Sequence, residues 1–293
     1  MKVLVTGGAG FIGSHIVDAL RARGDDVIVL DSLDPGVHHG PPAYLRSDVD
    51  YCFVDLRYWR PDARFDDVEA VIHLAALGGV SRAAKEVENV LGANVGGTAK
   101  LAEAARGWPK LRAVVLASSF SIYGSGYSYR CDDCGALRTG ERETGALERG
   151  QFEVRCAACY GPTTIVAIGT DAVPSPLETY GASKYMQELV FRGFEHAPVH
   201  IMRFSSVYGT RLRVDDGEAT IIAKLAGWIE KGIAPDLYED GQQIRDWVYV
   251  GDVVDTALAL ISLDAPARLV NVCSGAPTTL AEACDLLAEV YDT

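Results

Sequence analysis

Short runs of apolar residues alternate with amphipathic stretches along the first 120 residues of the chain. The runs are nearly continuous in apolar positions and predict strands over 2–6, 26–31, 51–54, 70–76 and 113–119. Apolar residues at helical spacing predict helices over 12–23 and 85–106. Strands that alternate with helices form parallel sheets covered on both faces. The pattern therefore predicts an α/β fold built on a doubly wound parallel sheet.

This alternation stops between 124 and 171, a stretch rich in Gly, Arg and Cys with only weak strand-like alternation near 151–155. We interpret residues 125–171 as an insertion. Beyond it the pattern predicts helices over 183–196, 218–231, 252–263 and 279–290. Strands or extended segments are predicted over 200–209, 236–238, 247–250 and 269–274.

The charge balance excludes some classes of partner. The chain carries 27 Lys and Arg against 40 Asp and Glu, a net charge of −13. This argues against binding to nucleic acids or anionic membranes, because both require basic clusters. No apolar run approaches the roughly 18 residues of a membrane-spanning helix. Met1 and Lys2 lead directly into the first strand rather than into a signal peptide, so we expect a cytoplasmic protein.

A glycine-rich turn, TGGAGFIG, follows the first strand and opens the first helix. Gly7, Gly10 and Gly13 fit the spacing of a dinucleotide-binding turn, and the strand–turn–helix context supports that function. Without Cβ atoms the backbone turns sharply and approaches a pyrophosphate, which the amides at the helix N-terminus then hold. The alternative is a tight turn that binds nothing.

Two aspartates lie at the carboxyl ends of predicted strands. Asp31 lies 18 residues after Gly13, where a carboxylate accepts hydrogen bonds from both adenosine ribose hydroxyls and repels a 2′-phosphate. This favours NAD over NADP, although a turn-capping role would also explain Asp31. Asp55 follows the third strand and is a candidate to meet the adenine amine, but a solvated loop aspartate is an equal alternative.

Tyr180 and Lys184 are spaced i, i+4 and therefore face the same way on a helix. A tyrosine with its ordinary pKa near 10 is too weak an acid to exchange protons at neutral pH. A lysine ammonium one turn away and a nicotinamide cation would lower that pKa. Taken alone, a tyrosine and a lysine at this spacing would be interpreted as a surface pair. In a chain that also has a dinucleotide-binding turn, the pair indicates proton-transfer chemistry.

Several motifs in the right order resemble the extended short-chain dehydrogenase/reductases, and in particular the NAD-dependent epimerase/dehydratase group that acts on nucleotide sugars. They are TGGAGFIG, Asp31, HLAA, NVGGT, SSFSIYG, YGASK, RFSSVYG, GEATII, DGQQIRDWVYVGDVV and NVCSG. The resemblance covers nearly the whole chain except about 125–171. It implies a Rossmann-type NAD-binding domain over 1–124 and 172–204, and a smaller substrate lobe over 205–293 from which 247–275 partly return to the first domain.

The resemblance also implies roles for individual residues. The catalytic residues would be Ser119, Tyr180 and Lys184. Cofactor contacts would come from Gly7, Gly10, Phe11, Ile12, Gly13, Asp31, Asp55, Leu56, Leu74, Ala75, Ala76, Asn94, Ser118, Tyr180 and Lys184. Substrate contacts would come from Ser119, Ser121, Ser206 and Arg245. Arg245 resembles the arginine that grips the substrate diphosphate; an ion pair with Asp246 or Asp252 is the alternative.

Three features depart from the family pattern. Dehydratases carry Asp-Glu where this chain has Phe120 and Ser121, which argues against 4,6-dehydration. Ser206 replaces the family's usual asparagine, so the phosphate contacts are expected to differ. The chain stops at Thr293, where relatives continue for several tens of residues, and we expect a trimmed or disordered tail.

Four of the seven cysteines form two C-x-x-C pairs separated by 21 residues, Cys131/Cys134 and Cys156/Cys159. This spacing predicts a Cys₄ zinc ribbon whose closed site is structural. A redox dithiol pair, free cysteines and an iron–sulfur cluster are the alternatives. The ribbon leaves the strand bearing Ser119 and returns before Tyr180, so it would wall the sugar pocket or form a subunit contact. Cys52, Cys273 and Cys284 are interpreted as small buried hydrophobes.

The expected activity is NAD-dependent epimerisation of a UDP-, dTDP- or GDP-linked sugar, at C4 through a 4-keto intermediate. A nucleotide-sugar 4-reductase or dehydrogenase is the nearest alternative. A non-enzymatic NAD sensor or scaffold that uses the ribbon for partners is the alternative from a different class. Relatives pair through two helices per subunit, so the resemblance implies a homodimer.

Overall fold

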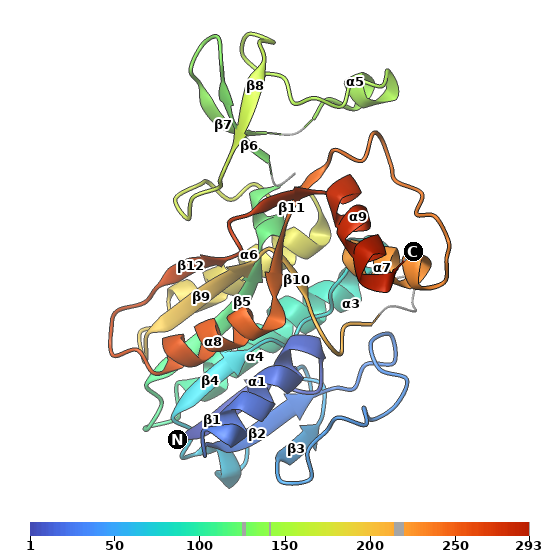
Figure 1. The fold of residues 1–293 in the computed structure, drawn as a ribbon. Helices are drawn as coiled ribbons and strands as arrows, with labels where there is room; N and C mark the ends of the chain where they lie inside the picture. The colour runs from blue at the N-terminus through green and yellow to red at the C-terminus, as the bar shows by residue number, and fades with distance from the viewer. Residues whose placement is uncertain (125–126, 141, 214–219, 293) are drawn as a thin grey trace.

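The computed structural model describes residues 1–124, 127–140, 142–213 and 220–292 (Figure 1). Its main element is a parallel seven-stranded sheet of order β12-β9-β5-β4-β1-β2-β3. The strands are β1 (Lys2–Thr6), β2 (Asp26–Asp31), β3 (Asp50–Phe53), β4 (Ala70–His73), β5 (Ala113–Ser119), β9 (Val199–Phe204) and β12 (Leu269–Val272). The predicted doubly wound α/β sheet is confirmed.

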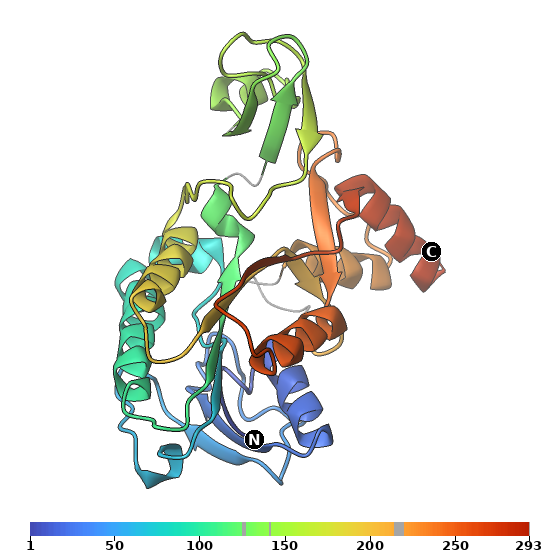
Figure 2. The same ribbon diagram turned by 90° about the vertical axis from the view of Figure 1, so that its left-hand side faces the viewer.

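Helices cover both faces of this sheet (Figure 2). On one face lie α1 (Phe11–Ala22) and α8 (Val250–Ile261); on the other lie α4 (Gly97–Ala105) and α6 (Thr179–Arg192). Successive strand residues alternate between the two resulting cores: Val3 and Val5 pack with α1, and Leu4 packs on the opposite side. All three side chains are fully buried, which explains why the strand sequences are almost continuously apolar.

Two smaller sheets complete the described chain. One joins β10 (Ser206–Tyr208), β11 (Ile244–Tyr249) and β13 (Pro277–Thr279) beside the packed helices α7 (Ile221–Glu230) and α9 (Leu280–Tyr291). The other is antiparallel and lies beyond the carboxyl end of β5 (Figure 1). It contains β6 (Tyr127–Cys131), β7 (Leu137–Gly140) and β8 (Thr163–Val166), with the short helix α5 (Thr144–Glu148) between β7 and β8. We call the described residues of 127–166 the cysteine ribbon.

The helix expected over 85–106 is confirmed over 87–105, where α3 (Val87–Leu91), a π turn at Gly92–Gly96 and α4 follow one another without interruption. A separate short helix, α2 (Val80–Lys85), precedes it. One predicted strand is wrong: none forms at 236–238, where Tyr238 is 82% exposed and buries nothing. The weak alternation near 151–155 forms no strand.

Other element boundaries shift. The extended run over 200–209 divides at Ser205 into β9 and β10, which belong to different sheets. The helix expected from Ser183 begins at Thr179 instead, because the Glu178 carboxylate accepts hydrogen bonds from the backbone N–H groups of Tyr180 and Gly181. Within the described residues, no helix is long and apolar enough to cross a membrane.

Candidate active site and cysteine cluster

A cavity of about 490 Å³ lies at the carboxyl ends of β1, β2, β4 and β5. Ligands of open parallel sheets bind at this edge, where the loops leave the strands. Every residue predicted above to contact the cofactor lines this cavity, except Asn94. The structure therefore brings together residues as distant as Gly7 and Lys184.

The glycine-rich turn fits tightly under the cavity. Gly7 has φ +72°, and a Cβ atom there would lie 2.8 Å from the backbone nitrogen of Ala75. A Cβ on Gly13 would lie 2.1 Å from the Gly7 carbonyl oxygen. Only glycine fits these positions, since real Cβ contacts are longer. The first backbone N–H groups of α1 have no partner within the helix and border the cavity, as an anion site requires.

Asp31 is held in place at the end of β2. Its carboxylate accepts hydrogen bonds from the backbone nitrogens of Ala9 and Leu33, each at 2.9 Å. His38 lies 3.9 Å away, and burial lowers the pKa of this histidine. Asp55 forms an ion pair with Arg57 at 2.6 Å, which lowers the pKa of Asp55 against the effect of burial, so its adenine contact stays a prediction.

One wall of the cavity was not predicted from sequence patterns. Tyr44, Arg82 and Arg211 line it together with the loop after β2, and the Tyr44 hydroxyl donates to the Ala9 carbonyl at 2.9 Å. These residues come from unpatterned loops and a short helix. Only the position of the loop, directly after the carboxyl end of β2, could have indicated a role.

Tyr180 meets Ser119 because α6 begins against the turn that follows β5. A Cβ on Gly181 would lie 2.5 Å from the Ser121 carbonyl oxygen, so the two segments touch at a glycine. The Ser119 side chain lies close enough to Tyr180 to lower the pKa of its phenol, and Ser119 Oγ accepts a hydrogen bond from the Ser121 backbone nitrogen at 3.1 Å. Lys184 lies one turn further along α6 and lines the same cavity. The three predicted catalytic side chains therefore converge.

Burial shifts both titrating groups of this site. It raises the pKa of Tyr180 to about 12, although the Ser119 side chain opposes the rise. It lowers the pKa of Lys184 to about 7, against the opposing charge of Glu188. Such displaced values are typical of functional sites, because proton transfer at neutral pH needs groups moved from their ordinary range.

Behind Lys184 lies a buried polar network that the sequence patterns did not reveal. The Lys184 ammonium donates to Gln187 Oε1 at 2.7 Å, and Gln187 Nε2 donates to Thr98 Oγ1 at 2.7 Å. His73 connects Thr98 to Thr6 through its two ring nitrogens, at 2.8 and 2.6 Å. Burial lowers the pKa of His73 to about 3, so it is neutral. This network fixes the position of the Lys184 ammonium group.

Asn94 lies behind the cavity wall rather than in it. Its side chain accepts from the Leu77 backbone nitrogen at 2.7 Å and donates to the Leu77 carbonyl at 3.1 Å and to Ser183 Oγ at 2.9 Å. The π turn aims this side chain at the loop after β4. In this structure Asn94 positions a cavity-lining residue, Leu77, instead of lining the cavity itself.

Ser118, in contrast, lines the cavity and is tied to a buried ion pair. Its hydroxyl donates to Glu188 Oε1 at 2.5 Å, and Glu188 pairs with Arg203 at 2.7 Å. Arg203 also donates to the Tyr123 hydroxyl at 2.7 Å. All four side chains are buried, so the end of β5 is fixed by charge-assisted hydrogen bonds.

All four predicted substrate contacts, Ser119, Ser121, Ser206 and Arg245, lie outside the lining of the cavity. Arg245 donates to the Ile244 carbonyl at 2.9 Å and to Gln243 Oε1 at 3.4 Å. Between described residues it forms no ion pair with Asp246, whose carboxylate accepts instead from Ser205, Ser274 and Gly275, nor with Asp252. The ion-pair alternative is therefore not realised among the described residues, and the diphosphate contact of Arg245 stays a prediction.

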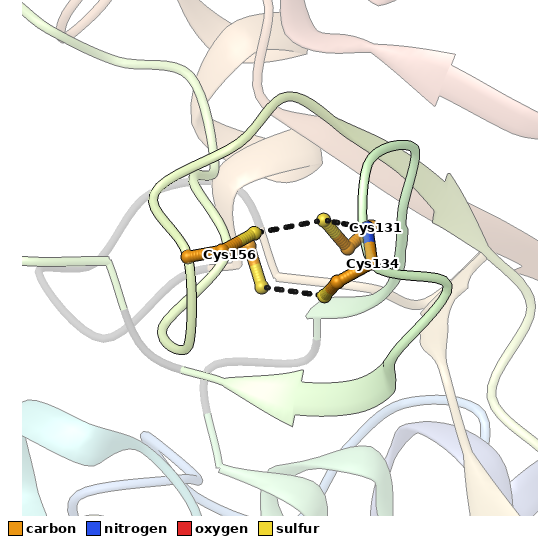
Figure 3. A group of neighbouring side chains, drawn as sticks. Cys131, Cys134 and Cys156 are labelled. Carbon is orange, nitrogen blue, oxygen red and sulfur yellow. Dashed lines mark hydrogen bonds between the residues drawn. The ribbon is translucent and has the colours of Figure 1, made fainter.

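The two C-x-x-C pairs meet in the cysteine ribbon (Figure 3). The four sulfur atoms lie within 4.8 Å of one another, with 3.4 Å between Cys131 and Cys159 and 3.8 Å between Cys134 and Cys156. A tetrahedral zinc site with Zn–S bonds of ~2.3 Å has sulfur atoms about 3.8 Å apart. Backbone N–H groups of Ala158 and Cys159 lower the pKa of Cys156 to about 6, whereas hydrogen bonds with neighbouring cysteines raise the pKa values of Cys134 and Cys159. This donor set fits a metal that binds thiolates.

The scattered cysteines differ from expectation. Cys273 is exposed, so its interpretation as a buried hydrophobe was wrong. Cys52 and Cys284 are only partly buried, and Cys52 packs against the core that contains Leu4.

The fold and this site define a class: a dinucleotide-binding α/β protein with a Ser–Tyr–Lys arrangement at the end of the central strands. The chain matches the model of the NAD dependent epimerase/dehydratase family over residues 3–142 and 152–273. The chain belongs to this family.

Its relatives are similar over nearly the full chain. It is 32% identical to the dTDP-L-rhamnose 4-epimerase of Burkholderia thailandensis, over 99% of this chain and 81% of that protein. It is 31% identical to the putative UDP-glucose 4-epimerase of Methanocaldococcus jannaschii, over 97% and 81%. The solved Thermus thermophilus UDP-glucose 4-epimerase complex with NAD is 30% identical, with a TM-score of 0.72 and coverage of 100% and 84%.

Proposed function

We propose that the chain is an NAD-dependent nucleotide-sugar 4-epimerase. The observation that carries the proposal is the convergence of Ser119, Tyr180 and Lys184 beside a cavity whose glycine-rich turn and Asp31 fit a dinucleotide. The similarity to curated 4-epimerases supports it. NAD, when bound, supplies the chemistry of hydride removal and return at C4 of the sugar.

The residues of this chain handle the proton. Ser119 binds the 4-hydroxyl, and Tyr180 takes its proton during oxidation and returns it during reduction. In the free protein the pKa of Tyr180 is about 12, so this pKa must be lowered before the phenol can accept a proton at neutral pH. A protonated Lys184 and the positive charge of the oxidised nicotinamide lower that pKa when the site is loaded. Lys184 also holds the nicotinamide ribose.

The sugar is carried on a UDP, dTDP or GDP group, and Ser121, Ser206 and Arg245 contact it. The arginine guanidinium suits a diphosphate because its donors form a fork. Phe120 and Ser121 have no carboxylate for abstraction at C5, so the keto sugar is not dehydrated. The keto sugar would have to turn in the pocket, so that NAD, when bound, could act on its other face.

Incubating the purified protein with UDP-, dTDP- and GDP-sugars without added cofactor tests the function. Epimer formation, with no net change in absorbance of reduced nicotinamide, would support an epimerase. Stoichiometric cofactor turnover would support the alternative 4-reductase or dehydrogenase. Absence of any ligand-dependent chemistry, together with a bound partner, would support an NAD sensor or scaffold.

We propose that Cys131, Cys134, Cys156 and Cys159 hold a structural zinc ion. The ribbon core consists of little more than Tyr129, Val154 and two of these cysteines, which is too small to fold the segment alone. Four thiolates leave no open coordination position for water. Elemental analysis should give about one zinc per chain, and Cys134→Ser should lose it; a metal-free wild type would contradict the proposal.

We propose a Rossmann-type domain over 1–124 and 172–204, a zinc-ribbon insertion over 125–171 and a substrate lobe over 205–293. We also propose a homodimer. Val87 on α3 and Met186 and Leu189 on α6 are 44%, 44% and 41% exposed on adjoining helices. Pairing of these helices would bury them. Light scattering on wild type and Met186→Glu tests this, with a monomeric wild type as the contrary result.

A further inference from the structure

The cysteine ribbon is fastened to the rest of the molecule at its base. Just after β8, the Ile168 carbonyl accepts a hydrogen bond from Asn271 Nδ2 at 2.9 Å. Asn271 Oδ1 in turn accepts from the Tyr123 hydroxyl at 2.9 Å, and Tyr123 accepts from Arg203. The base is therefore connected to the buried ion pair that fixes the end of β5.

A second contact joins the cysteine ribbon to the loop before β11. Arg142, between β7 and α5, forms a forked ion pair with Glu239 in the loop before β11, with 2.9 Å between Arg142 Nη2 and Glu239 Oε1. The two side chains are only 18% and 16% exposed. Ion pairs with two parallel hydrogen bonds that are partly shielded from water contribute measurably to stability. This one holds together segments 97 residues apart.

Glu239 at one end of this contact, and Tyr160 near the other end, have left-handed backbone conformations. Glu239 has φ +60°, in the left-handed region that disfavours residues other than glycine. Tyr160, which directly follows Cys159, has φ +60° as well, and its hydroxyl donates to the Glu143 carboxylate at 3.1 Å. Strained residues persist where surrounding contacts hold them. Tyr160 and Glu143 thus link a cysteine pair to Arg142.

The loop that contains Glu239 leads to Arg245. Arg142 most strongly, and then Gln243 and Arg245, lower the pKa of Glu239, so all three favour its carboxylate form. Gln243 Oε1 accepts from Arg245 Nη2 at 3.4 Å. No residue of the ribbon lines the dinucleotide cavity. The ribbon is therefore in contact with the proposed substrate side and separate from the cofactor side.

We propose that the metal-loaded cysteine ribbon holds the loop before β11 through Arg142 and Glu239, and so positions Arg245 for the diphosphate of the substrate. This inference rests on the proposed function and goes further: it makes the affinity for the nucleotide sugar depend on a metal outside the catalytic centre. Arg142 and Glu239 are positioning residues, since they act through Arg245. Loss of the metal releases Tyr160, Glu143 and Arg142 together.

Arg142→Ala and Glu239→Gln test the contact, with the exchanged pair Arg142→Glu/Glu239→Arg as the rescue. Arg155→Ala is the matched control, because Arg155 pairs with Glu153 at the exposed surface of the same ribbon. We expect KM and the calorimetric Kd for UDP or dTDP to rise roughly fivefold, with kcat and bound NAD unchanged. The exchanged pair should recover at least half of the loss.

Removing zinc from the wild type with a chelator should raise KM as much as Arg142→Ala does. Removing zinc from the Arg142→Ala variant should not raise its KM further. A zinc-free protein with wild-type KM would overturn the proposal, as would an Arg142→Ala variant with wild-type KM and Kd. The melting temperature of each variant checks that the fold survives, and Arg142→Lys supplies a second, milder variant.

Hydrogen exchange of residues 239–245 provides a readout that does not need activity. Exchange should accelerate in Arg142→Ala and in the zinc-free protein, and not in Arg155→Ala. Unchanged exchange would overturn the ribbon contact whatever the activity. If the wild type epimerises no sugar, the proposed function fails, while accelerated exchange in the variants would still support the contact. The two failures are therefore distinguishable.

Discussion

Lys184 and Gln187 are buried one turn apart on α6, and the Lys184 ammonium donates to Gln187 Oε1 at 2.7 Å. Gln187 offers a neutral oxygen rather than a carboxylate. The hydrogen bond satisfies the ammonium but does not neutralise its charge, so burial still lowers the pKa of Lys184 to about 7. The catalytic lysine is thus held at a cost in stability.

Lys184→Met should change how stability depends on pH. Below about pH 7 the lysine is protonated in both states, so the folded protein bears the full penalty of a buried charge. Between about pH 7 and 10.5 the unfolded chain binds a proton that the folded one lacks, so this group's destabilisation fades as pH rises. Urea unfolding at pH 6, 8 and 10 should show wild-type stability gaining relative to Lys184→Met by up to about 1 kcal/mol per pH unit.

The exposed Lys231→Met serves as the control, because its pH dependence should follow that of the wild type. Parallel pH profiles for wild type and Lys184→Met would contradict a depressed pKa for Lys184. Activity should be lost in Lys184→Met at every pH.

Glu188→Ala should destabilise the protein by about 3–5 kcal/mol, because it leaves the Arg203 guanidinium buried without its partner. The two side chains are only 6% and 4% exposed. Replacing both partners, as in Glu188→Leu/Arg203→Met, should cost less than the single change, since no charge is then stranded. Chemical denaturation measures both. A single variant within 1 kcal/mol of wild type would show that water reaches the pair.

Gly13→Ala should abolish dinucleotide binding. The added Cβ would lie 2.1 Å from the Gly7 carbonyl, so the turn must open and the donors of α1 move away. We expect stability to fall by roughly 1–3 kcal/mol and NAD retention to fall at least tenfold. Gly193→Ala is the control, because nothing lies within 4 Å of its Cβ position. Normal NAD content in Gly13→Ala would argue against this turn as the pyrophosphate site.

The sequence predicted the strands of the large sheet well because each is buried on both faces. Residues such as Val3, Leu4 and Val5 must then be apolar in succession, which leaves a strong local signal. The π turn within the predicted helix at Gly92–Gly96 left none, because helical spacing continues on both sides of it. Its purpose became visible only through Asn94, which the turn aims at Leu77.

Site residues with local motifs were predictable, and those defined by contacts were not. Tyr180 and Lys184 share a helix, so their spacing indicates that they act together. Gln187 and His73 meet 114 residues apart inside the protein. Periodicity shows which positions are polar but not which polar groups from different elements face one another. The same reason hid the contact of Arg142 with Glu239.

Tyr180→Phe should lower kcat by about two to four orders of magnitude, because general acid–base catalysis contributes on that scale. NAD should remain bound, since the phenyl ring preserves the shape of the cavity wall and Lys184 keeps its place. Ser119→Ala should lower kcat less, because the serine hydroxyl binds the sugar 4-hydroxyl but does not itself take the proton. Tyr185→Phe, on the same helix but outside the cavity lining, should act as wild type. Rates from coupled assays, with bound nicotinamide measured on the same samples, separate lost chemistry from lost cofactor. A Tyr180→Phe variant with more than a tenth of wild-type kcat would remove Tyr180 from the proton transfer.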